Sequence, residues 1–361
     1  MIHTRVPVRK DLTERIRRPP ALLVLPLLLL VLILALAVAS AHGSVSILPA
    51  TAIRIILNGL GLARFPATWD PREEAILLTL RLPRVAGAAL VGAALATAGA
   101  LFQGLLRNPL ADPYVVGTSG GAALGAVLGM MVGAQVTVLG FGIVPLAAFV
   151  GALAAMALVV GLAGVGGRLP AVTVLLAGFA VSSLLGYTVS LLLVLNDRLQ
   201  LQMPRVYGWL LGGIAVTGWS ELAVVGPLAV LTILATLGLA RSLNALSLGE
   251  DGAARLGIAV ERDKRLILVA GSLLTAAAVS ISGLIGFVGL IVPHVTRLLC
   301  GPDHRLLLPA TALAGASFLV LADLLARALL PPTELPVGIV TAFLGGPFFL
   351  WLLRHSRREY R

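Results

Sequence analysis

The sequence predicts an all-α membrane protein with ten transmembrane helices and both termini in the cytoplasm. Three observations support this prediction: the composition, the lengths of the uncharged runs and the distribution of basic residues. Hydrophobic residues make up 58% of the 361 residues and charged residues only 12%, with a mean hydropathy of +1.01. A soluble domain carries about 25% charged residues on average, because its surface must be wetted. The composition therefore excludes a soluble protein.

Uncharged runs mark the expected transmembrane helices. Residues 21–41 carry no charge, and a helix of this length spans the hydrocarbon core of a bilayer, which is about 30 Å thick. The run 113–167 is long enough for two helices separated near 133–141. The run from Leu266 onward is either one long tilted helix or two short helices that meet near Ser282 and Gly283. The remaining runs are 85–106, 169–196, 222–240, 306–322 and 335–353, which gives nine or ten spans.

Basic residues decide between nine and ten spans. Residues 1–20 hold six of them and residues 354–361 hold four, so the positive-inside rule places both ends in the cytoplasm. Two ends on one side require an even number of spans, hence ten, with a reversal near Gly283. On this topology 19 of the 27 Lys and Arg residues face the cytoplasm, so the net charge of +11 needs no nucleic-acid partner. The expected organisation is a basic N-terminus 1–20, a ten-helix membrane domain 21–353 and a basic tail 354–361.

A cleaved signal peptide is the alternative for the first uncharged run. Ala39, Ser40 and Ala41 resemble a cleavage site, and a basic segment precedes the run. However, the apolar stretch is longer than the roughly 7–15 residues usual in signal peptides, so a membrane helix is favoured. Cleavage would leave nine spans and an external N-terminus.

Two stripes of small residues predict close helix packing. Lipid supplies no hydrophobic force between helices, so association depends on small residues that let backbones approach. One stripe is Gly121, Gly125, Gly129 and Gly133, and the other is Ala88, Gly92, Ala96, Ala100 and Gly104. We expect the helices that carry them to lie inside the bundle.

Few polar groups fall inside the expected spans, where each needs a partner or a function. Asp323 and Arg327 are four residues apart and can pair along one helix face. Gln103 either hydrogen-bonds another helix or lines a hydrated path. His294 is either a ligand or a structural residue, the second being commoner. No acidic or histidine partner for Asp323 is evident at mid-membrane depth, which favours an ion pair over proton coupling.

The longest expected cytoplasmic connection, residues 241–265, should form two short helices separated at Gly257. Its first helix is amphipathic, with Glu250, Asp251 and Arg255 on a polar side and Leu246, Leu248 and Leu256 as apolar residues. Such an element suits docking to another protein. A P-loop needs Gly-Lys-Ser or Gly-Lys-Thr, and neither Lys10 nor Lys264 follows a glycine. ATP hydrolysis would therefore need a separate subunit.

Several long stretches resemble the FecCD permeases, the membrane subunits of bacterial ABC importers for iron-siderophores, haem and cobalamin. They are RLPRVAGAALVGAALATAGALFQGLLRNPLADPYVVGTSGGAALGA from Arg81, LSLGEDGAARLGI from Leu246, SGLIGFVGLIVPHVTRLLCGPDHRLLLPATALAGASFLVLADLLAR from Ser282 and ELPVGIVTAFLGGPFFLWLL from Glu334. The similarity covers roughly residues 70–353. It implies ten spans with both termini inside, as the charge distribution also requires.

The resemblance implies three groups of site residues. Arg81, Arg84 and Arg327 match arginines that form salt bridges with two glutamates of a substrate-binding protein, as bidentate guanidinium–carboxylate pairs allow. The translocation path and its gates would comprise Asn108, Pro109, Leu110, Ala171, Val172, Thr173 and Trp209, together with Gln103. The gate before the fifth span carries hydroxyl groups in the cobalamin permease, whereas Ala171 and Val172 are apolar here. ATPase contacts, within a coupling segment 242–262, would be made by Leu248, Gly249, Glu250, Ala254, Arg255, Leu256 and Gly257.

We therefore expect a permease subunit of an ATP-driven importer in the bacterial cytoplasmic (inner) membrane. Two copies would form a homodimer in the lipid bilayer, with a periplasmic or lipid-anchored substrate-binding protein and two ABC ATPase subunits that use ATP and Mg. The substrate would be an iron chelate (siderophore or haem) or cobalamin, iron chelates being favoured. No enzyme activity, cofactor, metal or nucleic acid is expected for this chain itself, and the lone Cys300 excludes a cysteine-based zinc cluster.

Two other function classes are compatible with a helical membrane bundle. An ion-coupled secondary transporter is the alternative, with Asp323 as the candidate for carrying a proton. Uptake driven by an ion gradient without any ATPase would favour it. A structural membrane anchor is a third interpretation, disfavoured by the polar residues along the expected path and by the large cytoplasmic connection.

Overall fold

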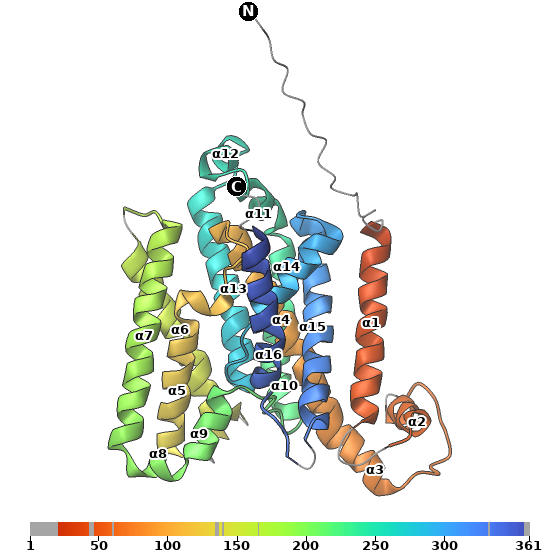
Figure 1. The fold of residues 1–361 in the computed structure, drawn as a ribbon. Coiled ribbons are helices and arrows are strands. Elements are labelled where there is room, and N and C mark those ends of the chain that lie inside the picture. Colours follow the sequence, from red (N-terminus) through yellow and green to blue (C-terminus); the bar gives the residue numbers. More distant parts are fainter. Residues whose placement is uncertain are drawn as a thin grey trace, which may run out of the picture.

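The computed structural model describes residues 21–42, 47–59, 61–133, 137–138, 141–164, 166–330 and 333–356. These residues form a helical bundle with one small β-hairpin (Figure 1). The expected basic N-terminus, 1–20, and residues 357–361 of the expected basic tail lie outside the described residues.

The elements of the first half surround a long central helix. They are α1 (Ala21–Ala41), α2 (Pro49–Gly59), α3 (Pro71–Ala75), the π-helical turn η1 (Ile76–Arg81), α4 (Leu82–Leu106), the 3-10 turn η2 (Pro113–Val116), α5 (Thr118–Val132), β1 (Thr137–Val138), β2 (Phe141–Gly142), α6 (Ile143–Ala163) and α7 (Ala171–Leu195). Strands β1 and β2 pair antiparallel.

The second half alternates short helices with long ones. Its elements are α8 (Asp197–Leu201), α9 (Met203–Leu210), α10 (Trp219–Leu237), α11 (Ala240–Leu246), α12 (Glu250–Arg255), α13 (Val260–Ser282), α14 (Val288–Cys300), α15 (His304–Ala328) and α16 (Val337–Ser356). Helices α11 and α12 lie at one end of the bundle, and α8 and α9 lie at the other (Figure 1). We call these the α12 end and the α9 end.

Ten helices of the described chain are apolar. Seven are long and apolar enough to cross a membrane: α1, α4 with the turns before it, α6, α7, α10, α13 and α15. Three more, α5, α14 and α16, are apolar but shorter. These helices fall on the uncharged segments identified in the sequence, which confirms a helical multi-span architecture. The number of crossings and the side of each terminus stay predictions.

The uncharged run from Leu266 onward forms two helices. Helix α13 ends at Ser282, Gly283 follows with φ 62° and ψ −156°, and α14 begins at Val288. Only glycine adopts this conformation readily, and a Cβ at Gly283 would overlap the carbonyl oxygen of Trp209. The predicted break near Gly283 is therefore confirmed.

The connection 241–265 does contain two short helices, but the prediction that Gly257 separates them is wrong. The two short helices are α11 and α12, and the residue between them in a glycine-requiring conformation is Gly249, with φ 98°. Gly257, with φ 78°, instead separates α12 from α13. The residues after Gly257 join α13 because Glu261 and Asp263 occupy its first turn, where acidic side chains interact favourably with the helix dipole.

Helix α4 is the centre of the bundle. It contacts α10, α13, α14 and α15, and nearly all of its side chains from Val85 to Leu105 are buried. By contrast, α7 lies at the edge of the bundle (Figure 1) and exposes large apolar residues such as Phe179 and Leu184. Apolar side chains on such an edge suit contact with lipid or with another protein.

The predicted small-residue stripes lie at the closest helix contacts. On α4, a Cβ at Gly92 would overlap the carbonyl oxygen of Gly315 on α15. On α5, Gly121 and Gly125 lie in the same way against backbone atoms of α6. Their burial confirms that both helices are interior. The fourth glycine of the α5 stripe, Gly133, has open space around it and ends the helix instead.

Replacing Gly92 by valine should destabilise the bundle strongly. The new Cβ would overlap Gly315 and lie 2.7 Å from Cβ of Leu319, and overpacking of this kind costs about 1–3 kcal/mol or more. We expect a lower midpoint of thermal unfolding for the detergent-purified variant. Gly161→Val on α6, where a Cβ meets nothing within 4 Å, is the matched control. Equal midpoints for the two variants would contradict the packing described here.

Candidate transport site

An ion cluster joins three segments at the α9 end. Asp323 of α15 accepts hydrogen bonds at Oδ1 from Nε (3.2 Å) and Nη2 (3.1 Å) of Arg84 on α4, and at Oδ2 from Nε of Arg327 (3.0 Å). Nη1 of Arg84 donates to Oε2 of Glu334, which precedes α16, at 2.7 Å. The pair between Asp323 and Arg327 is as predicted, whereas Arg84 and Glu334 are additional partners.

The carboxylate of Asp323 is the buried centre of this cluster, with a side chain only 1% exposed. The guanidinium groups of Arg84 and Arg327 neutralise it, and together they donate hydrogen bonds to both of its oxygens. Such burial is tolerated only with this kind of complete pairing, because removing one partner leaves an uncompensated charge. Glu334 differs, since half of its side chain is exposed.

The cluster also holds the end of α1. Arg81 donates to the carbonyl oxygen of Ala41 at 3.2 Å, and Arg327 donates to that of His42 at 3.0 Å. These oxygens belong to the last residue of α1 and to the residue that follows it, where no intrahelical partner is available for them. Arg81 and Arg327 therefore fasten α1 to the bundle.

The three arginines expected to dock a binding protein do lie close together, but they differ in exposure. Arg81 is 7% exposed, and the side chain of Arg327 is also 7% exposed. The side chain of Arg84 is 23% exposed. In this conformation Arg84 is therefore the member that an external carboxylate can reach most readily.

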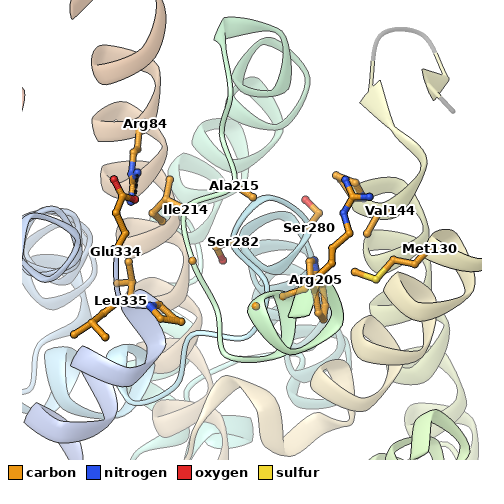
Figure 2. A pocket seen from close by; sticks show the side chains of 16 residues that line it. Arg84, Met130, Val144, Arg205, Ile214, Ala215, Ser280, Ser282, Glu334 and Leu335 are labelled. Atoms are coloured by element: carbon orange, nitrogen blue, oxygen red, sulfur yellow. Dashed lines mark hydrogen bonds and ion pairs between the residues drawn. The ribbon is translucent and has the colours of Figure 1, made fainter. Parts of the chain in front are cut away.

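A cavity of about 460 Å³ opens next to the cluster. Arg84 and Glu334 lie on one wall and Arg205 on the opposite wall, with Ser280 and Ser282 between them (Figure 2). This volume is within the roughly 300–1,000 Å³ range of small-molecule sites. The other lining residues, Met130, Val144, Pro145, Gly208, Trp209, Gly213, Ile214, Ala215, Leu335, Pro336 and Val337, are mostly apolar.

Of the residues expected along the path, Trp209 is the one that lines this cavity. Arg205 is not among the expected residues, although a charge four positions before Trp209 in a short segment between apolar runs is a usable signal. Glu334 is a similar signal, because it is an isolated charge directly before the last apolar run. The contact of Glu334 with Arg84, and the position of Arg205 on the opposite wall, arise only in the folded chain.

Gln103 makes a helix-to-helix contact. It is buried, and its Nε2 donates to the carbonyl oxygen of Leu290 on α14 at 3.1 Å. Of the two interpretations from the sequence, the structure supports the interhelical hydrogen bond. His294 packs edge-on against the ring of Phe348, and no three potential metal ligands gather within the described ranges.

The two expected gate segments approach each other toward the α12 end. Asn108 follows the end of α4, and its Oδ1 accepts the N–H of Leu110 at 2.9 Å in a tight turn that includes Pro109. Ala171 begins α7, with Val172 exposed and Thr173 half-buried. A small cavity of about 20 Å³ is lined by both Arg107, beside Asn108, and Ala171.

The expected coupling residues protrude at the α12 end (Figure 1). Leu248 is 70% exposed. Glu250, Ala254, Arg255, Leu256 and Gly257 are also exposed, and Gly249 is half-buried. Helix α12 is held to the bundle by Ala253, which is fully buried. The segment thus presents both apolar and charged groups to a partner.

Replacing Asp323 by asparagine should destabilise the protein by about 3–5 kcal/mol, since it leaves two largely buried guanidinium groups without their shared counter-charge. Glu334→Gln is the matched control. Its carboxylate is half-exposed, so its loss should cost no more than about 1 kcal/mol. The thermal unfolding midpoints of the two purified variants test this difference. A larger effect of Glu334→Gln would show that Asp323 is not the centre of the cluster.

Comparison with known proteins identifies the family. The FecCD transport family matches residues 27–355. The cobalamin import system permease BtuC of Halobacterium salinarum is 49% identical over 288 residues, covering 80% of this chain and 75% of that protein. The uncharacterized ABC transporter permease YvrB of Bacillus subtilis is 47% identical over 294 residues, covering 81% and 82%. The hemin transport permease HmuU of Yersinia pestis is 43% identical over 293 residues, covering 79% and 84%.

A solved structure agrees in fold with this chain. It is an inward-facing conformation of a transporter assigned to the metal-chelate type of ABC transporters. The TM-score is 0.75 at 31% identity, over 92% of this chain and 99% of that one. Sequence and structure thus agree over almost the whole length, and the chain belongs to the FecCD transport family.

Proposed function

We propose that this chain is the membrane permease of an ATP-driven importer for a metal chelate. It would work as a homodimer, with a substrate-binding protein on the outer side and two ATPase subunits, which use ATP and Mg, on the inner side. Membership of the FecCD transport family carries the proposal, since its relatives include permeases named for cobalamin, hemin and Fe(3+)-citrate. The family match also favours an importer subunit over an ion-coupled secondary transporter.

The positions of the two partner sites support this arrangement. The arginine cluster lies at the α9 end and the exposed segment around α12 lies at the opposite end (Figure 1). An importer needs this separation, because the binding protein delivers substrate on one side and the ATPase subunits drive the conformational change from the other. The α9 end would face the exterior and the α12 end the cytoplasm.

Ten crossings with both termini inside suit the same orientation. The ten apolar helices supply the required number of segments. The basic residues of 1–20 and of 354–361 would then face the cytoplasm together with α11 and α12. A bacterial cytoplasmic membrane is the location that this topology and the family support.

An iron chelate with carboxylate groups is the substrate that the cavity favours. Arg84 and Arg205 approach it from opposite walls (Figure 2), and guanidinium groups pair strongly with carboxylates. The remaining lining is mainly apolar, which suits the organic part of a chelate. Siderophore complexes that carry free carboxylates, and haem, both fit this description better than a ligand without acidic groups.

Uptake by reconstituted vesicles tests the function directly. The permease, its ATPase and its binding protein are incorporated into liposomes loaded with ATP and Mg, and entry of a labelled ferric chelate is followed. We expect uptake only when ATP and both partner proteins are present. Uptake by vesicles without the ATPase, driven by a proton or sodium gradient, would contradict the proposal and favour a secondary transporter.

Arg84→Gln should weaken docking of the binding protein at least tenfold. Arg84 is the most exposed of the three arginines, and an incoming carboxylate could replace half-exposed Glu334 on its Nη1. Arg72→Gln is the control, because Arg72 is an exposed arginine on α3 at the same end. The measurement is the dissociation constant of the binding protein from the permease complex. Equal constants for the wild type and Arg84→Gln would exclude the docking role.

A further inference from the structure

Lys264 is a buried cation between two carboxylates. It is only 5% exposed, and its Nζ lies 3.0 Å from Oε1 of Glu250 and 3.1 Å from Oε1 of Glu261. Glu250 begins α12, whereas Lys264 and Glu261 belong to the first turns of α13. The ion pair with Glu250 therefore ties the protruding helix α12 directly to a long helix of the bundle.

The same cluster reaches the start of α7. The second carboxylate oxygen of Glu261, Oε2, accepts the backbone N–H of Leu169 at 3.1 Å. Leu169 is buried and lies two residues before the first residue of α7, Ala171. A continuous series of charged hydrogen bonds thus runs from α12 through Lys264 and Glu261 to the segment that begins α7.

These contacts surround the place where the two expected gate segments meet. Lys264, Glu250 and Ala171 line the small cavity of about 20 Å³ together with Arg107, which precedes the expected gate residue Asn108. Arg107 also reaches the start of α12, since a Cβ at Gly249 would lie 3.6 Å from its Nη1. The cavity has room for about one water molecule, so its lining residues lie close together.

The buried end of this connection is the Lys264 ammonium, whereas the side chain of Glu250 is 46% exposed and that of Glu261 is 26% exposed. An exposed ion pair is screened by water and contributes little, whereas breaking a buried pair leaves a charge without compensation. The ammonium of Lys264 has two carboxylates to hold it, and one of them is fixed in turn by a backbone N–H. A displacement of α12 that draws Glu250 away would therefore take one of two counter-charges from the buried ammonium of Lys264.

We propose that Lys264 is a positioning residue that transmits the movement of α12 to the start of α7. Lys264 contacts α12 through Glu250. Toward α7 it contacts Glu261, which accepts the N–H of Leu169, two residues before Ala171. This inference rests on the proposed function, because it assumes that an ATPase moves α12. It adds the route by which that movement reaches the gate.

The test compares transport with ATP hydrolysis in the complete complex in proteoliposomes. Lys264→Met keeps an unbranched side chain that is one heavy atom shorter, but it removes the charge and the hydrogen bonds. We expect ATP hydrolysis within about twofold of the wild type, since the exposed Leu248 and Leu256 are unchanged. Uptake of the ferric chelate per ATP hydrolysed should fall at least tenfold.

Three further variants make the result specific. Lys264→Arg, which keeps the cation, should restore much of the coupling. Arg265→Met, an exposed position on the same turn of α13 and outside the coupling segment, should behave as the wild type. Glu261→Ala leaves the pair between Lys264 and Glu250 intact but removes the contact with Leu169, and it too should uncouple uptake from hydrolysis.

Several outcomes would overturn the inference. Unchanged uptake by Lys264→Met would do so, as would a parallel loss of uptake and ATP hydrolysis in both Lys264→Met and Glu261→Ala. Failure of both variants to reach the membrane would assign the cluster a role in folding alone. A wild-type complex without ATP-driven uptake would reject the proposed function itself, and with it this route.

Discussion

Close approach of α4 to its neighbours is the constraint on which the rest of the structure depends. Gly92 faces the backbone of Gly315 and Gly99 faces that of Gly289, so α14 and α15 contact α4 without intervening side chains. In lipid, such van der Waals contact replaces the hydrophobic force that holds a soluble core together. The positions of Arg84, Gln103 and the turn after α4 all follow from it.

Two polar groups inside the bundle, on Asp323 and Gln103, lie where this close packing brings partners within reach. Asp323 is neutralised by arginines of α4 and α15, and Gln103 bonds a carbonyl group of α14. Each of these contacts removes the cost of a polar group away from water. The charges that remain accessible, on Arg84, Arg205 and Glu250, gather at the two ends of the bundle, where partners and substrate would be met.

Local patterns in the sequence predicted local structure well. Uncharged runs located the apolar helices, Gly283 marked a helix break, and the spacing of Asp323 and Arg327 marked an ion pair. Contacts between distant residues were beyond such patterns. Arg84 and Asp323 are 239 positions apart, and nothing local in either segment indicates the pair. The division between the two short helices was predicted at Gly257, after α12, but it lies at Gly249, before α12. Both glycines have positive φ, and the sequence alone does not distinguish them.

The fastening of α1 has a consequence for how the chain is assembled during synthesis. The carbonyl oxygen of His42 is satisfied by Arg327, a residue made 285 positions later. Until α15 is made, the end of the first helix lacks that partner and is held by Arg81 and by contacts with α2 and α4. The attachment of the first apolar helix is therefore completed only by the ninth, and a chain that ends before α15 leaves the carbonyl oxygen of His42 without its arginine.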